Sequence, residues 1–277
     1  MKPHPILEPY ANLLAGRFWF DSQKGKEALI LVHGNGDEAD TWRHLFVPLT
    51  EHFRVIAPDL PGFGRSQTQD ARVSGLVDWL FSFIEQLGLK RVHLLGSSLG
   101  GVVASLFAEK YPMYATSLCV IGGASPSLGN LQPTHAIQPL LQEGIGEAYY
   151  NGLRDTDPDV AFATLRPYYA NLESLAKPEQ DFLRTRVWAR VFSNPQRDAF
   201  FTALRSLFTP STRNIRLQTP CQLIWGDTDR IVPLEHAKII QQQLPNTPLS
   251  VVKAAGHLPH QEQATTTLQY FLQNHPS

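Results

Sequence analysis

Short apolar segments alternate with longer helical patterns along this chain of 277 residues, and this alternation constrains the fold more than any other feature. Because few polar residues interrupt them, the short segments are typical of strands buried on both faces of a sheet. We predict six such strands: Ala28–His33, Phe53–Ala57, Val92–Gly96, Ser117–Gly122, Cys221–Gly226 and Leu249–Val252. The patterns between and after them predict four helices: Val73–Leu87, Leu99–Lys110, Leu234–Leu244 and Gln261–Asn274. Repetition of strand, helix and strand predicts an α/β fold with a mostly parallel central sheet covered by helices on both faces.

The N-terminal region predicts an antiparallel addition to this sheet. Leu13–Leu14 and Phe18–Asp21 are short apolar segments that Gly16 separates. We expect them to pair as a hairpin at the edge of the sheet.

One long stretch lacks the alternation. From about Ser125 to Pro220 prolines punctuate helical fragments, and no strand is expected. We interpret residues 125–215 as a helical cap over the sheet, and residues 1–124 and 216–277 as the core. The many aromatic residues of this stretch favour a small core of its own, with the lining of a ligand site as the alternative.

Composition argues against several other classes of protein. The chain has 24 Lys and Arg against 25 Asp and Glu, so its net charge of −1 gives no reason to expect a nucleic-acid partner. Cys119 and Cys221 are too few for a disulfide scaffold or a Cys-rich zinc site, and we expect buried, reduced thiols. Residues 1–9 lack the apolar core of a signal peptide, and no uninterrupted run of 18 apolar residues exists. We therefore expect a cytoplasmic protein without a membrane span.

The segment 96–100, Gly-Ser-Ser-Leu-Gly, matches G-x-S-x-G and lies between a predicted strand and a predicted helix. In such a sharp turn the flanking chains nearly collide, and Gly96 and Gly100 would relieve this crowding. The motif places a nucleophile at Ser98, with Ser97 as the neighbouring competitor. A tight glycine turn with a capping serine is the structural alternative.

A serine hydroxyl is a poor nucleophile without a base. His257 follows the last predicted strand, on a loop that can reach across the end of the sheet. His260 is the alternative, but it falls where the final helix is expected to begin. A histidine in a loop is by itself more often an ordinary surface residue.

The base needs an acidic partner that fixes its tautomer. Asp229 and Asp227 both follow the fifth predicted strand. We favour Asp229, which lies further into the loop, and interpret Asp227 as a turn residue that bonds nearby backbone N–H groups. Ser98, Asp229 and His257 each follow a separate strand, and the carboxyl ends of parallel strands meet at one edge of the sheet. Together the three residues predict a catalytic triad.

Attack of a serine on a carbonyl group also needs donors for the oxyanion that develops. Residues 33–36, His-Gly-Asn-Gly, follow the first predicted parallel strand. We propose the backbone N–H of Asn35, together with that of Leu99, the residue after the nucleophile. His33 is expected to form local hydrogen bonds and not to act as a base.

Several motifs in one order carry a resemblance to a known family. They are HGNG at 33–36, Trp42, APDLPGFGRS at 57–66, LLGSSLGG at 94–101, LIWGDTDRIVP at 223–233 and AAGHLPHQEQ at 254–263. With them the chain resembles the α/β-hydrolase family, in its branch with a helical cap and a Ser-Asp-His triad. The resemblance covers nearly the whole core, whereas the cap shows no comparable motif.

Departures from the pattern narrow the activity that the resemblance implies. Ser98 stands where the related haloalkane dehalogenases and epoxide hydrolases carry an aspartate, which disfavours both classes. Leu258 stands where carbon–carbon hydrolases of the meta-cleavage type often carry tryptophan, and this weakens that reading without removing it. Ser97 stands where family members often carry histidine, a departure that concerns only the details of the substrate.

We therefore expect a serine hydrolase that cleaves a carboxylic ester or related acyl bond of a small, largely apolar molecule through an acyl-enzyme. The alternative is a carbon–carbon hydrolase or lyase on a diketone or succinyl-type substrate, and a third possibility is a non-catalytic binding module. No metal or cofactor is required, and a monomer or homodimer is expected. One arginine of a set of seven in the cap is a candidate anchor for a substrate carboxylate, although we interpret most of them as solvated helix faces: Arg154, Arg166, Arg184, Arg186, Arg190, Arg197 and Arg205.

Overall fold

The computed structural model describes residues 1–25, 27–123, 133–135, 137–209 and 217–275. Within these ranges eight strands form one sheet in the order β1-β2-β4-β3-β5-β6-β7-β8. The strands are β1 (Ala11–Leu14), β2 (Arg17–Asp21), β3 (Ala28–Val32), β4 (Arg54–Pro58), β5 (Val92–Ser97), β6 (Ala115–Ile121), β7 (Cys221–Gly226) and β8 (Leu249–Val252). In this order the six strands from β4 to β8 pair in parallel. β1 and β2 form an antiparallel hairpin at the edge of the sheet, where β2 pairs with β4. The predicted mostly parallel α/β sheet and its edge hairpin are confirmed.

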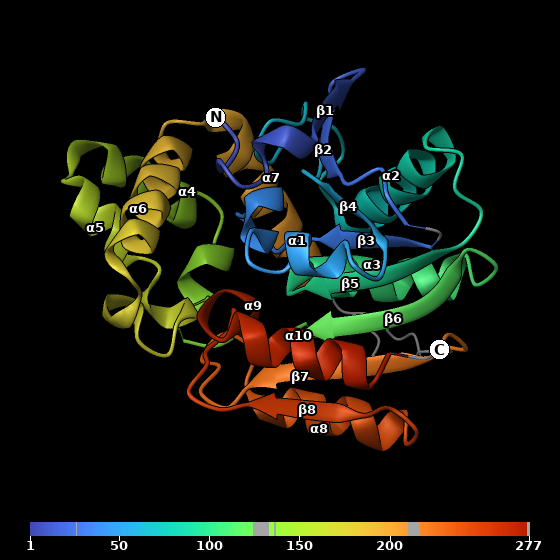
Figure 1. The fold of residues 1–277 in the computed structure, drawn as a ribbon. Helices are drawn as coiled ribbons and strands as arrows, with labels where there is room; N and C mark the ends of the chain where they lie inside the picture. The colour runs from blue at the N-terminus through green and yellow to red at the C-terminus, as the bar shows by residue number, and fades with distance from the viewer. Residues whose placement is uncertain (26, 124–132, 136, 210–216, 276–277) are drawn as a thin grey trace.

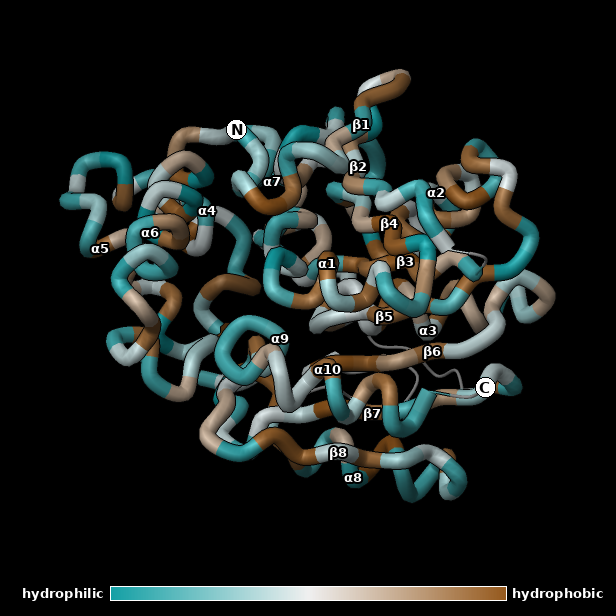
Figure 2. The backbone as a smooth tube through the Cα atoms, viewed as in Figure 1, coloured by the Kyte–Doolittle hydropathy of each residue, from teal (hydrophilic) through white to brown (hydrophobic). Residues whose placement is uncertain are grey.

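Helices cover both faces of this sheet (Figure 1). One face carries α2 (Val73–Gln86), α3 (Leu99–Lys110) and α8 (Leu234–Gln243), and the other carries α1 (Phe46–Leu49) and α10 (Ala264–Gln273). The brown, apolar parts of the chain follow the central strands between these two layers (Figure 2).

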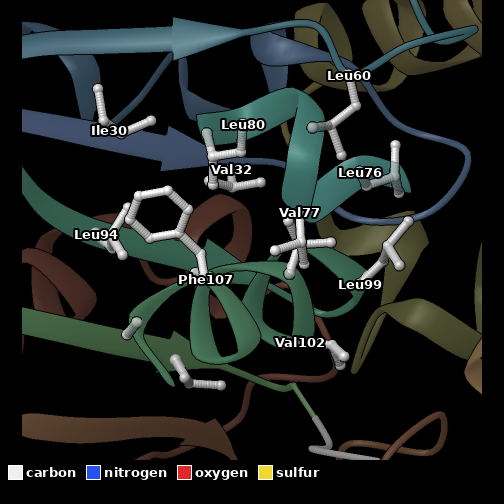
Figure 3. Close-up of a cluster of buried hydrophobic side chains, with 14 of the residues drawn as sticks. Ile30, Val32, Leu60, Leu76, Val77, Leu80, Leu94, Leu99, Val102 and Phe107 are labelled. Atoms are coloured by element: carbon white, nitrogen blue, oxygen red, sulfur yellow. The ribbon is translucent and has the colours of Figure 1, made fainter. Parts of the chain in front are cut away.

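The central strand β3 shows why the sheet is buried on both sides. Successive side chains of a strand point to opposite faces. Ile30 and Val32 therefore belong to the core beneath α2 and α3, whereas Leu29 and Leu31 belong to the core beneath α1 and α10. Figure 3 shows the first of these cores, in which Phe107 of α3 joins the β3 side chains. Continuous apolar composition in the strands thus follows directly from two helical layers.

The elements between β6 and β7 lie beyond the carboxyl ends of the parallel strands (Figure 1). They are the short 3-10 turns η3 (Gln138–Leu141), η4 (Leu153–Asp155), η5 (Arg166–Tyr168) and η6 (Leu172–Ser174), and the helices α4 (Ile145–Gly152), α5 (Pro158–Ala163), α6 (Lys177–Val191) and α7 (Asn194–Leu207). In the described part of this stretch no strand occurs. Both predicted cap boundaries, at 124/125 and 215/216, lie outside the described residues. None of the helices in the described ranges has the length and apolarity to cross a membrane.

One predicted helix differs in form. The segment expected as a single helix over Gln261–Asn274 is divided into α9 (Pro259–Glu262) and α10. The break lies at Gln263, whose backbone angles of φ −132° and ψ 53° are outside the helical region. His260 consequently lies inside α9.

Candidate active site

Ser98 lies at a sharp turn between β5 and α3. Its backbone angles are φ 54° and ψ −121°, a conformation that non-glycine residues rarely adopt. The Ser98 N–H donates to the carbonyl of Ile121 at 2.9 Å, and the Ser98 carbonyl accepts from the N–H of Val102 at 3.2 Å. These bonds hold the residue in the strand-turn-helix geometry that the G-x-S-x-G motif predicts.

Two flanking glycines make this turn sterically possible. A Cβ atom on Gly96 would lie 2.3 Å from the carbonyl oxygen of Gly100. A Cβ atom on Gly100 would lie 2.0 Å from the carbonyl oxygen of Val32. The two chain segments therefore pass each other with no room for a side chain at either position.

His257 and Asp229 form a buried pair beside this turn. The Nδ1 atom of His257 lies 2.8 Å from Oδ2 of Asp229, and both side chains are almost fully buried. The second oxygen of Asp229, Oδ1, accepts the backbone N–H groups of Ile231 and Val232, each at 2.9 Å. The carboxylate is thus fixed by its own loop and presents one oxygen to the imidazole.

Asp227 and His260, the alternatives to Asp229 and His257 in the sequence, have other partners. Asp227 lies 3.6 Å from Nζ of Lys253, and its carboxylate accepts no backbone N–H among the described residues. The prediction that Asp227 bonds the turn backbone is therefore wrong, because Asp229 makes those bonds. His260 contacts Thr41 through Nε2 at 3.0 Å, and burial holds its pKa well below the usual value.

Gly122, directly after β6, is a site residue that sequence reasoning missed. Its φ is +56°, and a Cβ atom there would lie 3.2 Å from Nδ1 of His257 and 3.3 Å from Oδ2 of Asp229. A side chain at this position would press on the His257–Asp229 pair. The available signal was a glycine as the last residue of a predicted strand, next to a second glycine.

Ser98 and His257 both line one cavity of about 570 Å³. The Nε2 atom of His257 is buried and has no hydrogen-bond partner within the described residues. The imidazole therefore offers a free nitrogen on the side that faces away from Asp229, at the wall of the cavity that Ser98 shares.

The loop after β3 passes next to Ser98. A Cβ atom on Gly34 would lie 3.2 Å from Cβ of Ser98. Among the described residues, neither the N–H of Asn35 nor that of Leu99 has a hydrogen-bond acceptor. The Asn35 side chain donates to the carbonyl of Phe200 at 3.1 Å, which ties this loop to α7.

His33 stabilises the start of the same loop. Its Nδ1 lies 2.8 Å from the carbonyl oxygen of Gly34, and its Nε2 accepts the N–H of Leu60 at 2.8 Å. Both ring nitrogens are therefore engaged within the protein. The local role predicted for His33 is confirmed.

The elements between β6 and β7 close the cavity and are bonded to the base loop. The backbone carbonyl of Tyr168 accepts the N–H of His257 at 2.8 Å. The carboxylate of Glu262 accepts the N–H groups of Gly256 at 2.6 Å and Ala170 at 2.7 Å. The loop that carries His257 is thus held from both sides.

Some aromatic residues between β6 and β7 form small apolar cores of that stretch, and others line the cavity. Phe162, Tyr169 and Phe201 are buried in apolar clusters of the stretch itself. Tyr150 and Phe200, in contrast, line the cavity. The remaining wall is mostly aliphatic, so a ligand of apolar character suits the space.

The arginines of the stretch are not solvated as interpreted. Of the seven, only Arg166 is exposed, and the others are partly or fully buried. Carboxylates of the loop after β3 hold two of them. Arg186 contacts Asp40 at 2.9 Å, and Arg190 contacts Asp37 at 2.8 Å. The interpretation is wrong because apolar periodicity does not reveal charges paired between separate segments.

No cluster of three or more His, Cys, Asp or Glu side chains suited to a metal ion occurs in the described part of the chain. What the arrangement offers is a strained serine, an imidazole with one free nitrogen and a fixed carboxylate, beside two unpaired backbone donors. These are the components of nucleophilic attack on a carbonyl carbon.

Residues 27–264 match the model of the α/β hydrolase fold family. The chain is 28% identical over 256 residues to a 2-hydroxy-6-oxononadienedioate/2-hydroxy-6-oxononatrienedioate hydrolase of Pseudomonas putida, covering 88% of this chain and 86% of that protein. It is 27% identical over 250 residues to a pimeloyl-acyl-carrier-protein methyl ester esterase of Aeromonas salmonicida strain A449, covering 88% and 94%. The solved structure of 2-hydroxy-6-oxo-6-phenylhexa-2,4-dienoate hydrolase from Rhodococcus sp. strain RHA1 matches with a TM-score of 0.77 at 20% identity, covering 95% of this chain and 99% of that one.

Fold and sequence together define an enzyme of the hydrolase class. The chain belongs to the α/β-hydrolase family, as its motifs indicate. The hypothesis of a non-catalytic binding module is therefore not supported.

Proposed function

We propose that this enzyme is a serine hydrolase in which Ser98 is the nucleophile, His257 the general base and Asp229 the residue that orients the base. The observation that carries the proposal is the bond of 2.8 Å between His257 Nδ1 and Asp229 Oδ2, together with the unpartnered Nε2 at the cavity wall. A proton on Nδ1 leaves Nε2 free to accept the proton of Ser98. Attack on a carbonyl carbon then produces a tetrahedral oxyanion.

The backbone N–H groups of Asn35 and Leu99 are the proposed oxyanion donors. Leu99 follows Ser98 in the chain, and Asn35 follows Gly34, which passes next to Ser98, and lines the same cavity. Both N–H groups lack an internal acceptor among the described residues. Loss of one such donor in a serine hydrolase costs about 10²–10³ in rate. The proposed chemistry uses only side chains and water.

Carbon–carbon hydrolysis of a diketone is the reaction that we favour. In this reaction Ser98 adds to one ketone carbonyl, and the oxyanion then expels the neighbouring carbon as an enolate of the other ketone. Protonation of the enolate gives a ketone, and water releases the acid from the acyl-enzyme. The names of the Pseudomonas and Rhodococcus relatives support this class.

Hydrolysis of a carboxylic ester is the second candidate. Leu258, the residue that follows His257 in the chain, is aliphatic and lines the cavity. The mostly apolar wall suits the acyl part of a simple ester, and the Aeromonas relative is named as an ester hydrolase. The same triad serves both reactions, because only the leaving group differs.

Measuring the turnover of diketones and of an ester with one enzyme preparation decides between the two candidate reactions. We expect hydrolysis of benzoylacetone and of a vinylogous 1,5-diketone, with a kcat/KM above that for p-nitrophenyl butyrate. Ser98→Ala should abolish all three activities. Turnover of the butyrate alone would replace the favoured reaction with the second candidate, and equal turnover by Ser98→Ala would reject the proposed nucleophile.

We also propose a small-molecule substrate, a cap over residues 125–215 and a cytoplasmic location. Cys119 and Cys221 lie on the neighbouring strands β6 and β7 as free thiols, which suits a reducing compartment. Fractionation of the source cells tests the location, and recovery of the protein outside the cytoplasm would reject it.

A further inference from the structure

Arg190 is the one arginine among the described residues that line the main cavity, and it is already paired. Its Nη2 lies 2.8 Å from Oδ1 of Asp37 and 3.0 Å from Oε1 of Glu38. Its Nε donates to Oε2 of Glu38 at 3.1 Å. Two carboxylates therefore oppose the single positive charge.

Both carboxylates are held in place independently of a ligand. Glu38 is almost fully buried, with 1% of its side chain exposed, and also lies 3.5 Å from Nε of Arg186. Asp37 accepts the backbone N–H of Glu38 at 3.0 Å. Asp37 and Arg190 are the two charged residues of the described cavity lining, so this wall carries no net positive charge.

The neutral wall determines which ligands suit it. A substrate carboxylate near Arg190 would have to displace Asp37 or lie unpaired among apolar side chains, and an unpaired charge in such surroundings is costly. An uncharged acceptor meets no such penalty. The Nη1 group of Arg190 has no acceptor among the described residues and is free to donate to a ketone or amide oxygen.

We propose that the Asp37–Arg190 pair makes this enzyme selective for substrates that are uncharged where they contact the cap, and that Asp37 is the residue that determines this selectivity. The inference rests on the proposed function for its catalytic test, and it assigns the substrate class of the same site. It also separates this chain from relatives whose named substrates are carboxylates, such as the dienedioate of the Pseudomonas enzyme.

Two esters of equal length test the selectivity. Mono-p-nitrophenyl glutarate ends in a carboxylate, and p-nitrophenyl 4-carbamoylbutanoate carries a primary amide in its place. The wild-type enzyme should cleave the ester bond of the carbamoylbutanoate with a kcat/KM at least about tenfold higher than that of the glutarate. The difference should lie mainly in KM. In Asp37→Asn the kcat/KM of the carbamoyl ester, divided by that of the glutarate ester, should fall about tenfold, because Arg190 then retains only one carboxylate partner.

A matched control uses another acidic residue that pairs with an arginine of the cap. Asp181 on α6 contacts Arg184 at 3.1 Å and is half exposed, away from the cavity lining. Asp181→Asn should therefore retain the wild-type ratio. A wild-type preference for the glutarate, or an unchanged ratio in Asp37→Asn, would overturn the proposal.

Binding to Ser98→Ala separates this inference from the proposed function. Calorimetry should show 5-phenylpentanamide binding at least about tenfold more tightly than 5-phenylpentanoate, and Asp37→Asn in the same background should remove most of the difference. Equal or tighter binding of the carboxylate, or no binding of the amide, would overturn the inference. If the amide binds as expected while the wild type hydrolyses neither these esters nor the diketones, the proposed function fails and the charge selectivity stands.

Discussion

The two nitrogens of His257 have opposite surroundings, and this asymmetry is the basis of the proposed chemistry. Nδ1 contacts a carboxylate oxygen at 2.8 Å, whereas Nε2 is buried without a partner in the described residues. An imidazole with these surroundings is held in the tautomer that acts as a base toward a serine. Asp229 is able to impose this tautomer because its second oxygen is fixed by two backbone N–H groups.

Asp229→Asn should lower kcat by about 10⁴ with little change in thermal stability. The amide oxygen of asparagine can still accept the N–H groups of Ile231 and Val232, so its NH₂ group would face Nδ1. That contact favours the tautomer with the proton on Nε2, which cannot accept a proton from Ser98. Steady-state kinetics and thermal unfolding measure the two quantities.

Asp227→Asn is the matched control, since Asp227 lies beside Lys253 and does not contact His257. It should retain kcat within about threefold, in line with a substitution away from the reacting groups. A large loss in Asp227→Asn with normal kcat in Asp229→Asn would reverse the assignment.

The sequence was informative about residues that a motif or a strand end specifies. The order of Ser98, Asp229 and His257 after three strands led to residues that the structure brings to one end of the sheet. Gly122 and the Asp37–Arg190 pair could not be found this way. Their roles depend on distances between segments remote in sequence, and neither hydrophobic periodicity nor turn chemistry reports those distances.

At the scale of elements, the turn between β5 and α3 requires close contact with β3. The chain passes so near Val32 that Gly100 has no space for a Cβ atom. The apolar runs of the strands and the 3.6-residue pattern of α2 predicted this layering well, because both report burial directly. The division of the last helix at Gln263 was not predictable, since no proline or glycine marks it.

Gly100→Ala should lower the free energy of unfolding by about 3 kcal/mol, because the new methyl group would overlap the carbonyl of Val32. Gly152→Ala is the control, since a Cβ atom there meets nothing within 4 Å. Chemical denaturation of both variants measures the difference. Equal stability of the two variants would show that the turn tolerates a side chain and would contradict the geometry described.

At the scale of the whole molecule, buried ion pairs join α6 to the loop after β3. Arg186 and Arg190 contact Glu38, and Arg43 contacts Glu179 at 2.5 Å. Burial opposes the ionisation of Glu38, but the charges of Arg190 and Arg186 outweigh it and lower its pKa from 4.5 to about 2. Ionised Glu38 therefore links α6 to the loop after β3.

The link should make the protein sensitive to acid. Because the folded-state pKa of Glu38 is depressed, its contribution of about 3 kcal/mol is present above pH 4.5 and is lost as the pH falls toward 2. Glu38→Gln should be less stable at pH 7 and should lose less stability between pH 5 and 2 than the wild type. Denaturation curves over this range measure both effects.

Glu143→Gln, at an exposed position between β6 and β7, is the control and should follow the wild-type pH dependence. If Glu38→Gln and the wild type lost equal stability over the same range, the acid sensitivity would have another source.

Covalent labelling tests the assignment of the nucleophile most directly. The wild-type protein is treated with a fluorophosphonate, and the adduct is located by peptide mass spectrometry. We predict a single adduct on Ser98, slower labelling in His257→Ala and none in Ser98→Ala. An adduct on Ser97, or labelling that persists in Ser98→Ala, would contradict the account.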